Sequence, residues 1–214
     1  MTNNTPELTQ VQQQRRQTTV DALLQAAQRG LIDHGLDVSM DDIAQLAEVG
    51  RRTVFRYFAT REDLLSEAIA TASAGYLDAV ADCSGEDWRA WLADFALVMH
   101  ERAARAGRLY WEFASRRLPE RLAQAYAEHR QALQRLFDTV TVTVWSGAGG
   151  EGTAPEELRQ TVAAHLSPMF TQAVLLDAGG TPELAAKVAT NAIAGATRRL
   201  VRKQSRPGFA EEGA

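Results

Sequence analysis

The sequence predicts an all-α fold, with a short helix-turn-helix unit followed by a larger helical domain. Helix-favouring Ala, Leu, Gln, Glu and Arg dominate the periodic segments, and Gly and Pro fall mostly between those segments. The stretch 139–145 alternates with period two, but the chain offers it no partner strand, so we expect it to end a long helix. Expected boundaries are a disordered tail at 1–14, the helix-turn-helix unit at 15–61, the larger domain at 62–204 and a second tail at 205–214.

The bulk composition is that of a soluble globular protein. Of 214 residues, 45% are hydrophobic and 23% are charged, and no apolar run reaches the ~18–20 residues that would cross a bilayer. The N-terminus lacks the apolar segment of a secretory signal, and the single Cys83 allows no internal disulfide. We therefore expect a cytoplasmic protein with no membrane partner.

Net charge alone does not indicate a nucleic-acid partner. The chain carries a formal charge of −4, and residues 1–61 hold seven Arg and seven acidic residues. The shorter span 48–61, in contrast, holds four Arg and one Glu. An electrostatic argument therefore depends on where these arginines lie.

Cap residues set the expected helix ends in the first part of the chain. Gly35 stops the first helix as a left-handed cap, Ser39 caps the second, and Asp42 completes a capping box with Ser39. Thr60 caps the fourth helix, whose first turn is acidic. Helices are expected at about 15–34, 40–47, 51–58, 61–81, 86–105, 107–116, 118–145, 155–177 and 182–204.

The helix at 51–58 follows a tight turn and has two distinct sides. Val54 and Phe58 can close a small core with the preceding helix, which leaves an arginine-rich side outside. Guanidinium groups bind phosphate and pair bidentately with guanine in the major groove. The residues expected to contact DNA are Arg15, Arg16, Arg51, Arg52, Thr53, Arg56, Tyr57 and Arg61. The same pattern is also consistent with an ordinary helical hairpin that has a solvated arginine face.

The segment that contains this helix resembles a known family. Residues 39–65 run SMDDIAQLAEVGRRTVFRYFATREDLL and resemble the N-terminal signature of the TetR family of regulators, a similarity that covers about 15–65. The rest of the chain is similar in length, helicity and helix order. The resemblance implies a homodimeric DNA-binding regulator, usually a repressor, that releases a palindromic operator when a small molecule binds. Two recognition helices about one DNA turn (~34 Å) apart would also multiply affinity and specificity.

The sequence departs from the family pattern at four positions. Glu48 replaces the usual Gly of the turn, so a less tight turn is expected, and Gly50 replaces the usual Ser or Thr cap. Phe55 replaces a common Tyr, which removes a hydroxyl group, and Arg61 replaces Lys, which keeps the charge. Contacts at the first three positions are therefore expected to differ from those of the family.

The last two expected helices carry apolar stripes at three- to four-residue spacing. Gly195 beside the second stripe would allow close approach, and two such helices from each subunit could build a four-helix bundle. We expect a homodimer through about 155–204, although the stripes are also consistent with packing inside one subunit. The stripes consist of Leu158, Val162, Leu166, Met169, Phe170, Ala173 and Val174, and of Leu184, Val188, Ala192, Ala196 and Leu200.

Aromatic residues gather on several expected helices of the larger domain. Such a cluster is typical of an apolar core and also of a pocket for a small, mostly apolar effector. His100, Tyr126 and His129 are the polar groups expected to orient that effector, and Pro168 is expected to kink its helix and open the cavity. The full set expected at the pocket is Trp91, Phe95, Met99, His100, Trp111, Tyr126, His129, Phe137, Met169 and Phe170.

Catalytic chemistry is not indicated. The four histidines, at 34, 100, 129 and 165, are scattered without metal-ligand spacing, and no glycine-rich phosphate loop follows a strand. Cys83 has no sequence neighbour that would activate its thiol. We therefore expect no enzyme, no cofactor and no metal. A helical interaction protein without DNA binding and a small all-α enzyme are the alternatives, and salt-sensitive DNA binding would argue against the first.

Overall fold

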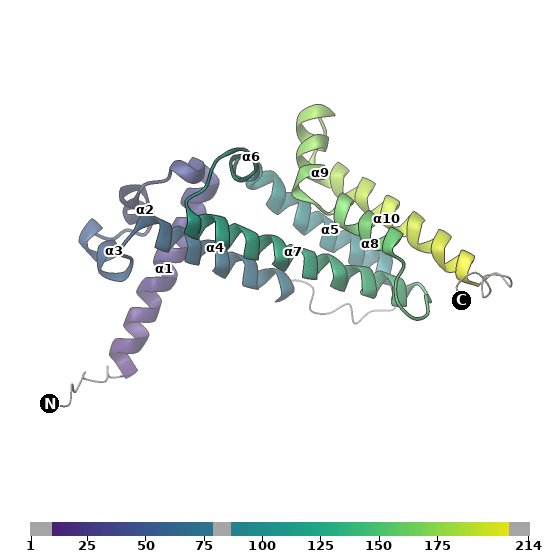
Figure 1. The fold of residues 1–214 in the computed structure, drawn as a ribbon, viewed down its shortest axis with the longest axis horizontal. Coiled ribbons are helices and arrows are strands. Elements are labelled where there is room, and N and C mark those ends of the chain that lie inside the picture. Colours follow the sequence, from purple (N-terminus) through teal and green to yellow (C-terminus); the bar gives the residue numbers. More distant parts are fainter. Residues whose placement is uncertain (1–9, 79–86, 206–214) are drawn as a thin grey trace.

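The structure, a computed structural model, describes residues 10–78 and 87–205. Within these ranges the chain is helical without strands, as predicted, and the molecule is elongated, with the short helices α2 and α3 at one end (Figure 1). In chain order the elements are α1 (Gln10–His34), η1 (Gly35–Asp37), α2 (Met40–Leu46), α3 (Arg51–Tyr57), α4 (Arg61–Asp78), α5 (Trp88–Arg105), α6 (Gly107–Ser115), α7 (Glu120–Gly147), α8 (Glu156–His165), α9 (Pro168–Gln172), the π-helix η2 (Ala173–Asp177) and α10 (Pro182–Gln204).

The N-terminal unit follows its local cap signals. Gly35 ends α1 with a φ of 69°, the left-handed conformation that glycine adopts without strain. The side chain of Ser39 accepts a hydrogen bond from the amide of Asp42 at 3.1 Å, and the Asp42 carboxylate accepts one from the amide of Ser39 at 2.8 Å. The predicted capping box is therefore confirmed.

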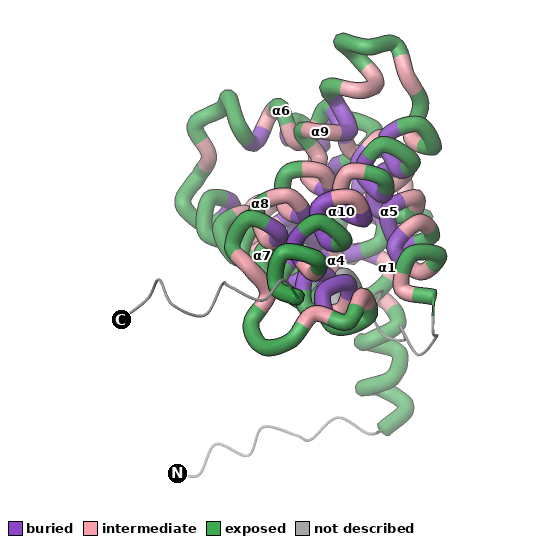
Figure 2. Tube along the Cα trace, turned by 90° about the vertical axis from the view of Figure 1, so that its right-hand side faces the viewer, coloured by how far each residue is buried: buried purple, intermediate pink, exposed green. Residues whose placement is uncertain are grey.

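Helix α1 begins earlier than the sequence predicted. Residues 10–14, expected to belong to a disordered tail, are helical because they are Gln and Val without a Gly or Pro to break the helix. Residues 10–18 are exposed on every side, so the first turns of α1 extend beyond the packed part of the molecule (Figure 2). Cys83 and the predicted end of the fourth helix beyond Asp78 lie outside the described residues.

The turn between α2 and α3 is tighter than expected. Its two hydrogen bonds, from the amide of Val49 to the carbonyl of Ala44 at 3.0 Å and from the amide of Glu48 to the carbonyl of Gln45 at 3.1 Å, form a Schellman motif. That motif places Glu48 at a φ of 55°, where a side chain is strained. The expectation of a looser turn is therefore wrong. The turn has the tight geometry, and the backbone of Glu48 is strained.

Glu48→Gly is expected to raise the free energy of unfolding by about 1 kcal/mol, because glycine adopts a positive φ without the steric clash of a Cβ atom. Urea unfolding followed by circular dichroism measures this change. Glu48→Ala is the matched control, since it removes the charge but keeps the Cβ. An equal gain in both variants would attribute the effect to the charge and contradict the strain.

The buried apolar residues form two clusters. One unites α1–α4 with Phe113 of α6 and with Leu122 and Ala125 at the start of α7. The other lies among α5, the rest of α7, α8 and α10. Helices α4 and α7 lie side by side, so α7 belongs to both clusters (Figure 1). The helix-turn-helix unit therefore shares its core with the first part of the larger domain.

Two segments of the larger domain test the sequence interpretation. Residues 139–145 are helical, as predicted. Thr139 and Thr141 donate hydrogen bonds one turn back, to the carbonyls of Arg135 at 3.0 Å and of Phe137 at 2.7 Å. The expected single helix at 155–177 is wrong, because it breaks instead of kinking. Ser167 is extended (ψ 148°), as the residue before a proline prefers, and caps a new helix that begins at Pro168.

None of the helices in the described ranges combines the length and the apolar character needed to cross a bilayer.

Candidate nucleic-acid interface and ligand cavity

Helix α3 has one buried residue and a polar outer face. Val54 packs into the N-terminal cluster, and the exposed residues of α3 are Arg51, Arg52, Phe55 and Arg56. Thr53 is half-buried. The helix therefore presents three guanidinium groups and one aromatic ring to a partner, with Phe55 at a position where the sequence had left the contact open.

Arg51 is held within the helix-turn-helix unit. Its guanidinium donates to the carboxylate of Asp41 on α2 at 2.5 Å and lies over the ring of Phe55, 5.2 Å from the ring centroid. Both partners of this ion pair are about 60% exposed, at 62% and 61%. An exposed pair of this kind contributes only ~0–1 kcal/mol, so DNA phosphates can replace Asp41 at little cost.

Tyr57 joins α3 to α1. Its hydroxyl group is hydrogen-bonded by Thr19, which, together with the neighbouring Arg56 and Arg16, holds the pKa of Tyr57 below its ordinary value. The guanidinium of Arg56 also lies over the Tyr57 ring at 5.0 Å. Arg16 and Arg15 lie in the exposed first part of α1. The structure therefore brings the predicted residues of α1 and α3 to one end of the molecule.

Arg61, also predicted to contact DNA, makes hydrogen bonds within the subunit. Its guanidinium donates to the carbonyl of Leu36 at 2.6 Å, to the carbonyl of Val38 at 3.2 Å and to the Glu62 carboxylate at 3.0 Å. These bonds tie the start of α4 to the segment between α1 and α2. The sequence could not indicate this, because the accepting carbonyls become neighbours only when the three helices pack.

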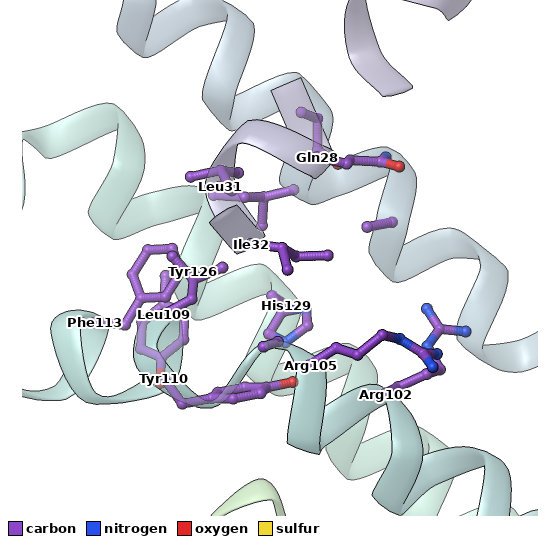
Figure 3. A pocket seen from close by; sticks show the side chains of 14 residues that line it. Gln28, Leu31, Ile32, Arg102, Arg105, Leu109, Tyr110, Phe113, Tyr126 and His129 are labelled. Carbon is purple, nitrogen blue, oxygen red and sulfur yellow. The ribbon is translucent and has the colours of Figure 1, made fainter. Parts of the chain in front are cut away.

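A cavity of about 210 Å³ lies where α1, α4, α5, α6 and α7 meet (Figure 3). Its wall is mostly apolar, with polar groups from four of the five helices. The side chains that line it include Gln28, Leu31 and Ile32 of α1, Ala68, Ile69 and Ala72 of α4, Arg102 and Arg105 of α5, Leu109, Tyr110 and Phe113 of α6, and Tyr126 and His129 of α7.

His129 lines this cavity with an uncharged imidazole ring. Burial, together with a smaller effect from the charge of Arg102, lowers its pKa to about 4. Its Nδ1 lies 2.8 Å from the hydroxyl oxygen of Ser73, which itself donates to the carbonyl of Ile69 at 2.7 Å. Because the Ser73 proton is used in that bond, Nδ1–H of His129 is the donor to Ser73.

A polar cluster joins α6 to the end of α1. The Glu112 carboxylate accepts a hydrogen bond from the amide of Leu36 at 2.6 Å and one from Arg108 at 2.8 Å. Burial raises the pKa of Glu112, but these bonds outweigh it and hold the pKa below its ordinary value. One turn further, Arg116 makes a bidentate pair with Asp37 at 2.7 and 3.0 Å. Helix α6 therefore touches both the cavity and the helix-turn-helix unit.

Tyr126 and His129 are the only residues of the predicted effector set that line this cavity, within the part of the chain that the structure describes. Trp91 stacks on Phe95 at 5.5 Å in the second apolar cluster, which also contains the other buried members. Trp111 is 50% and Met169 38% exposed. The buried members are Phe95, Met99 and Phe137, and Phe170 packs against the same cluster.

His100, predicted to orient the effector, is fully buried between α5 and α9. Its Nδ1 lies 2.8 Å from the hydroxyl oxygen of Thr171, and its ring is 5.8 Å from that of Phe170. Burial lowers the pKa of His100 to about 4, with a smaller effect from the charge of His165. The ring is thus a neutral part of the core and lies outside the cavity described above.

The predicted dimer stripes are only partly exposed. Leu158, Val162 and Leu166 of α8, with Ala196 and Leu200 of α10, are buried within the subunit because α8 and α10 pack on each other and on α7. A narrower outward stripe remains on α10: Leu184 is 46% and Val188 42% exposed. It continues through Ala192 to Gly195, whose missing Cβ would meet no atom within 4 Å.

Comparison with known proteins places this geometry among regulators. Residues 23–68 match the family described as bacterial regulatory proteins, tetR family. A TetR transcription regulator from Haloarcula marismortui is 19% identical with a TM-score of 0.64, over 86% of this chain and 98% of that one. A tetR-family regulator from Streptomyces coelicolor is 19% identical with a TM-score of 0.59, over 92% and 91%. A putative transcriptional regulator from Pseudomonas aeruginosa is 15% identical with a TM-score of 0.61, over 88% and 94%. No curated protein sequence matches the chain.

Residues 23–68 therefore match the model of the tetR family, and the chain shares the fold of the solved TetR-family structures over most of its length.

Proposed function

We propose that the chain is a ligand-responsive transcriptional repressor that binds a palindromic operator as a homodimer and releases it when a small molecule occupies the cavity. The observation that carries the DNA-binding part is the outer face of α3, with Arg51, Arg52 and Arg56 exposed in a unit that matches the TetR family. Guanidinium groups on a helix of this kind can contact both phosphates and guanine edges in the major groove. The unit responsible is the segment from α1 to the start of α4.

Arg52→Ala and Arg56→Ala are each expected to weaken operator binding by ~1–3 kcal/mol if the residue contacts a base pair bidentately. If the arginine contacts only a phosphate, its substitution would weaken binding to all DNA sequences alike. It would also lower the magnitude of the slope of log affinity against log salt concentration by about one. The operator is first selected from genomic fragments, and fluorescence anisotropy at several salt concentrations measures the affinities.

Arg130→Gln is the matched control, because Arg130 is exposed on α7, far along the chain from α3. It should bind the operator as the unchanged protein does. Unchanged operator affinity in both α3 variants would show that α3 does not contact the DNA. A failure to select any fragment would favour a helical interaction protein.

The ligand-responsive part of the proposal is supported by the position of the cavity. Gln28, Leu31 and Ile32 belong to α1, and the opposite wall belongs to α6, which Glu112 and Arg116 attach to Leu36 and Asp37. A molecule between α1 and α6 therefore contacts elements that are bonded directly to the helix-turn-helix unit. The homodimer is assigned to 155–204, with the stripe Leu184–Gly195 of α10 as its centre.

A further inference from the structure

The two charged groups of the cavity lie at one end. Figure 3 shows the side chains of Arg102 and Arg105 extending together on one side, with Phe113, Leu109 and Tyr126 on the other. The cavity thus has a cationic end and an apolar, partly aromatic end. Phe113 and Tyr126 stack with ring centroids 4.3 Å apart, which makes the apolar end flat and rigid.

The charged side chains that line the cavity are all positive, among the described residues. The lining contains two arginines and no carboxylate among the described residues, and the one histidine is neutral. Arg102 is half-buried and Arg105 exposed, three residues apart on the same side of α5. The charge of Arg102 is felt inside the cavity, because it contributes to the low pKa of His129. An entering anion would therefore meet two guanidinium groups at this end of the cavity.

We propose, resting on the ligand-responsive function above, that the cavity takes a small organic monocarboxylate whose acid group binds Arg102 and Arg105 and whose apolar body lies against Phe113 and Tyr126. A guanidinium group matches a carboxylate with two parallel hydrogen bonds, which selects the planar anion over an amine or an amide. The cavity of about 210 Å³ lies below the ~300–1,000 Å³ typical of sites for drug-sized ligands. The ligand is accordingly a short-chain or single-ring acid.

Matched probes test the charge requirement on the DNA-free protein. The probes are 3-phenylpropanoate, its neutral amide and the corresponding amine, together with hexanoate and octanoate, each titrated by calorimetry. We expect the phenylpropanoate to bind about tenfold or more tightly than the amide, and the amine to bind no more tightly than the amide. An amide that binds as tightly as the acid, or no binding by any of the three acids, would overturn the proposal.

Variants assign the effect to the two arginines. Arg102→Gln combined with Arg105→Gln is expected to reduce the preference for acid over amide to about twofold or less, whereas Arg105→Lys retains most of it because the charge remains. Arg130→Gln, an exposed neutralisation outside the cavity, should keep the full preference. A double variant that keeps the preference for the acid would overturn the assignment.

The test of the ligand class and the test of the proposed regulator function can fail independently of each other. Because ligand binding is measured without DNA, an acid that binds the cavity without releasing the operator supports the ligand class and contradicts the ligand response. Loss of operator binding in every experiment would contradict the regulator function and leave the calorimetric result standing.

Discussion

Val188→Arg is expected to convert the protein to a monomer and to weaken operator binding by roughly 10²–10⁴-fold. Val188 is 42% exposed at the centre of the outward stripe of α10, so the substitution does not disturb the core of the subunit. In a two-fold interface the new charge would meet its own copy or a neighbouring apolar side chain without water. Each monomer would then bind one half-site alone and lose the gain from a second recognition helix. Light scattering and anisotropy on the same samples measure both effects.

Val142→Arg is the matched control for this variant. Val142 is also apolar and exposed, at 61%, but it lies on α7, outside the proposed interface. It should remain dimeric and bind the operator normally. A Val188→Arg protein that stays dimeric would move the interface away from α10, and a Val142→Arg monomer would move it towards α7.

Acidification from pH 7 to pH 5 is expected to remove about 3–4 kcal/mol of folding free energy through His100 and His129, roughly 2 kcal/mol from each. The pKa of each imidazole is lowered from 6.5 to about 4 in the folded protein, chiefly by burial. Between these two values the unfolded chain binds more protons than the folded one. The folded state is therefore not destabilised by these two histidines above pH 6.5, and it loses free energy of unfolding as the pH falls from 6.5 towards 4. The pKa of Glu156 is lowered from 4.5 to about 2, so its contribution to stability is lost mostly below pH 4.5, at the acid end of this window or beyond it.

Urea unfolding at half-unit pH intervals measures this loss. His100→Gln and His129→Gln should each remove about half of the slope between pH 7 and 5. A slope that survives both core substitutions would show that other groups cause the acid sensitivity.

Local signals in the sequence were sufficient for several helix ends of the N-terminal unit. Ser39, Asp42 and Gly35 cap their helices through neighbours at most a few residues away, and the capping hydroxyl of Thr60 likewise accepts from the amide of Asp63 at 3.1 Å. The face of α3 followed from the same logic, because burying Val54 fixes where Arg52 and its neighbours point.

The cavity could not be predicted in the same way. An apolar stripe shows which face of a helix is buried and not what lies against it, so Phe95 of the core and Tyr126 of the cavity look alike in sequence. Arg102 and Arg105 resemble a solvated face, and only their three-residue spacing indicates a shared side of α5. The internal hydrogen bonds of Arg61 were hidden in the sequence for a related reason, since its carbonyl partners lie 23 and 25 residues away.

Helix α1 has one consequence for genetic experiments. It contributes Leu23 and Ala27 to the core of the helix-turn-helix unit, and a turn later it supplies Leu31 and Ile32 to the cavity wall. An unbroken helix moves as one rod, so a substitution at either place also displaces the other. A selection for altered inducer specificity should therefore return alleles in α1 that change operator affinity as well, whereas alleles in α5 at Arg102 or Arg105 should alter induction alone. Repression measured without inducer distinguishes the two classes of allele.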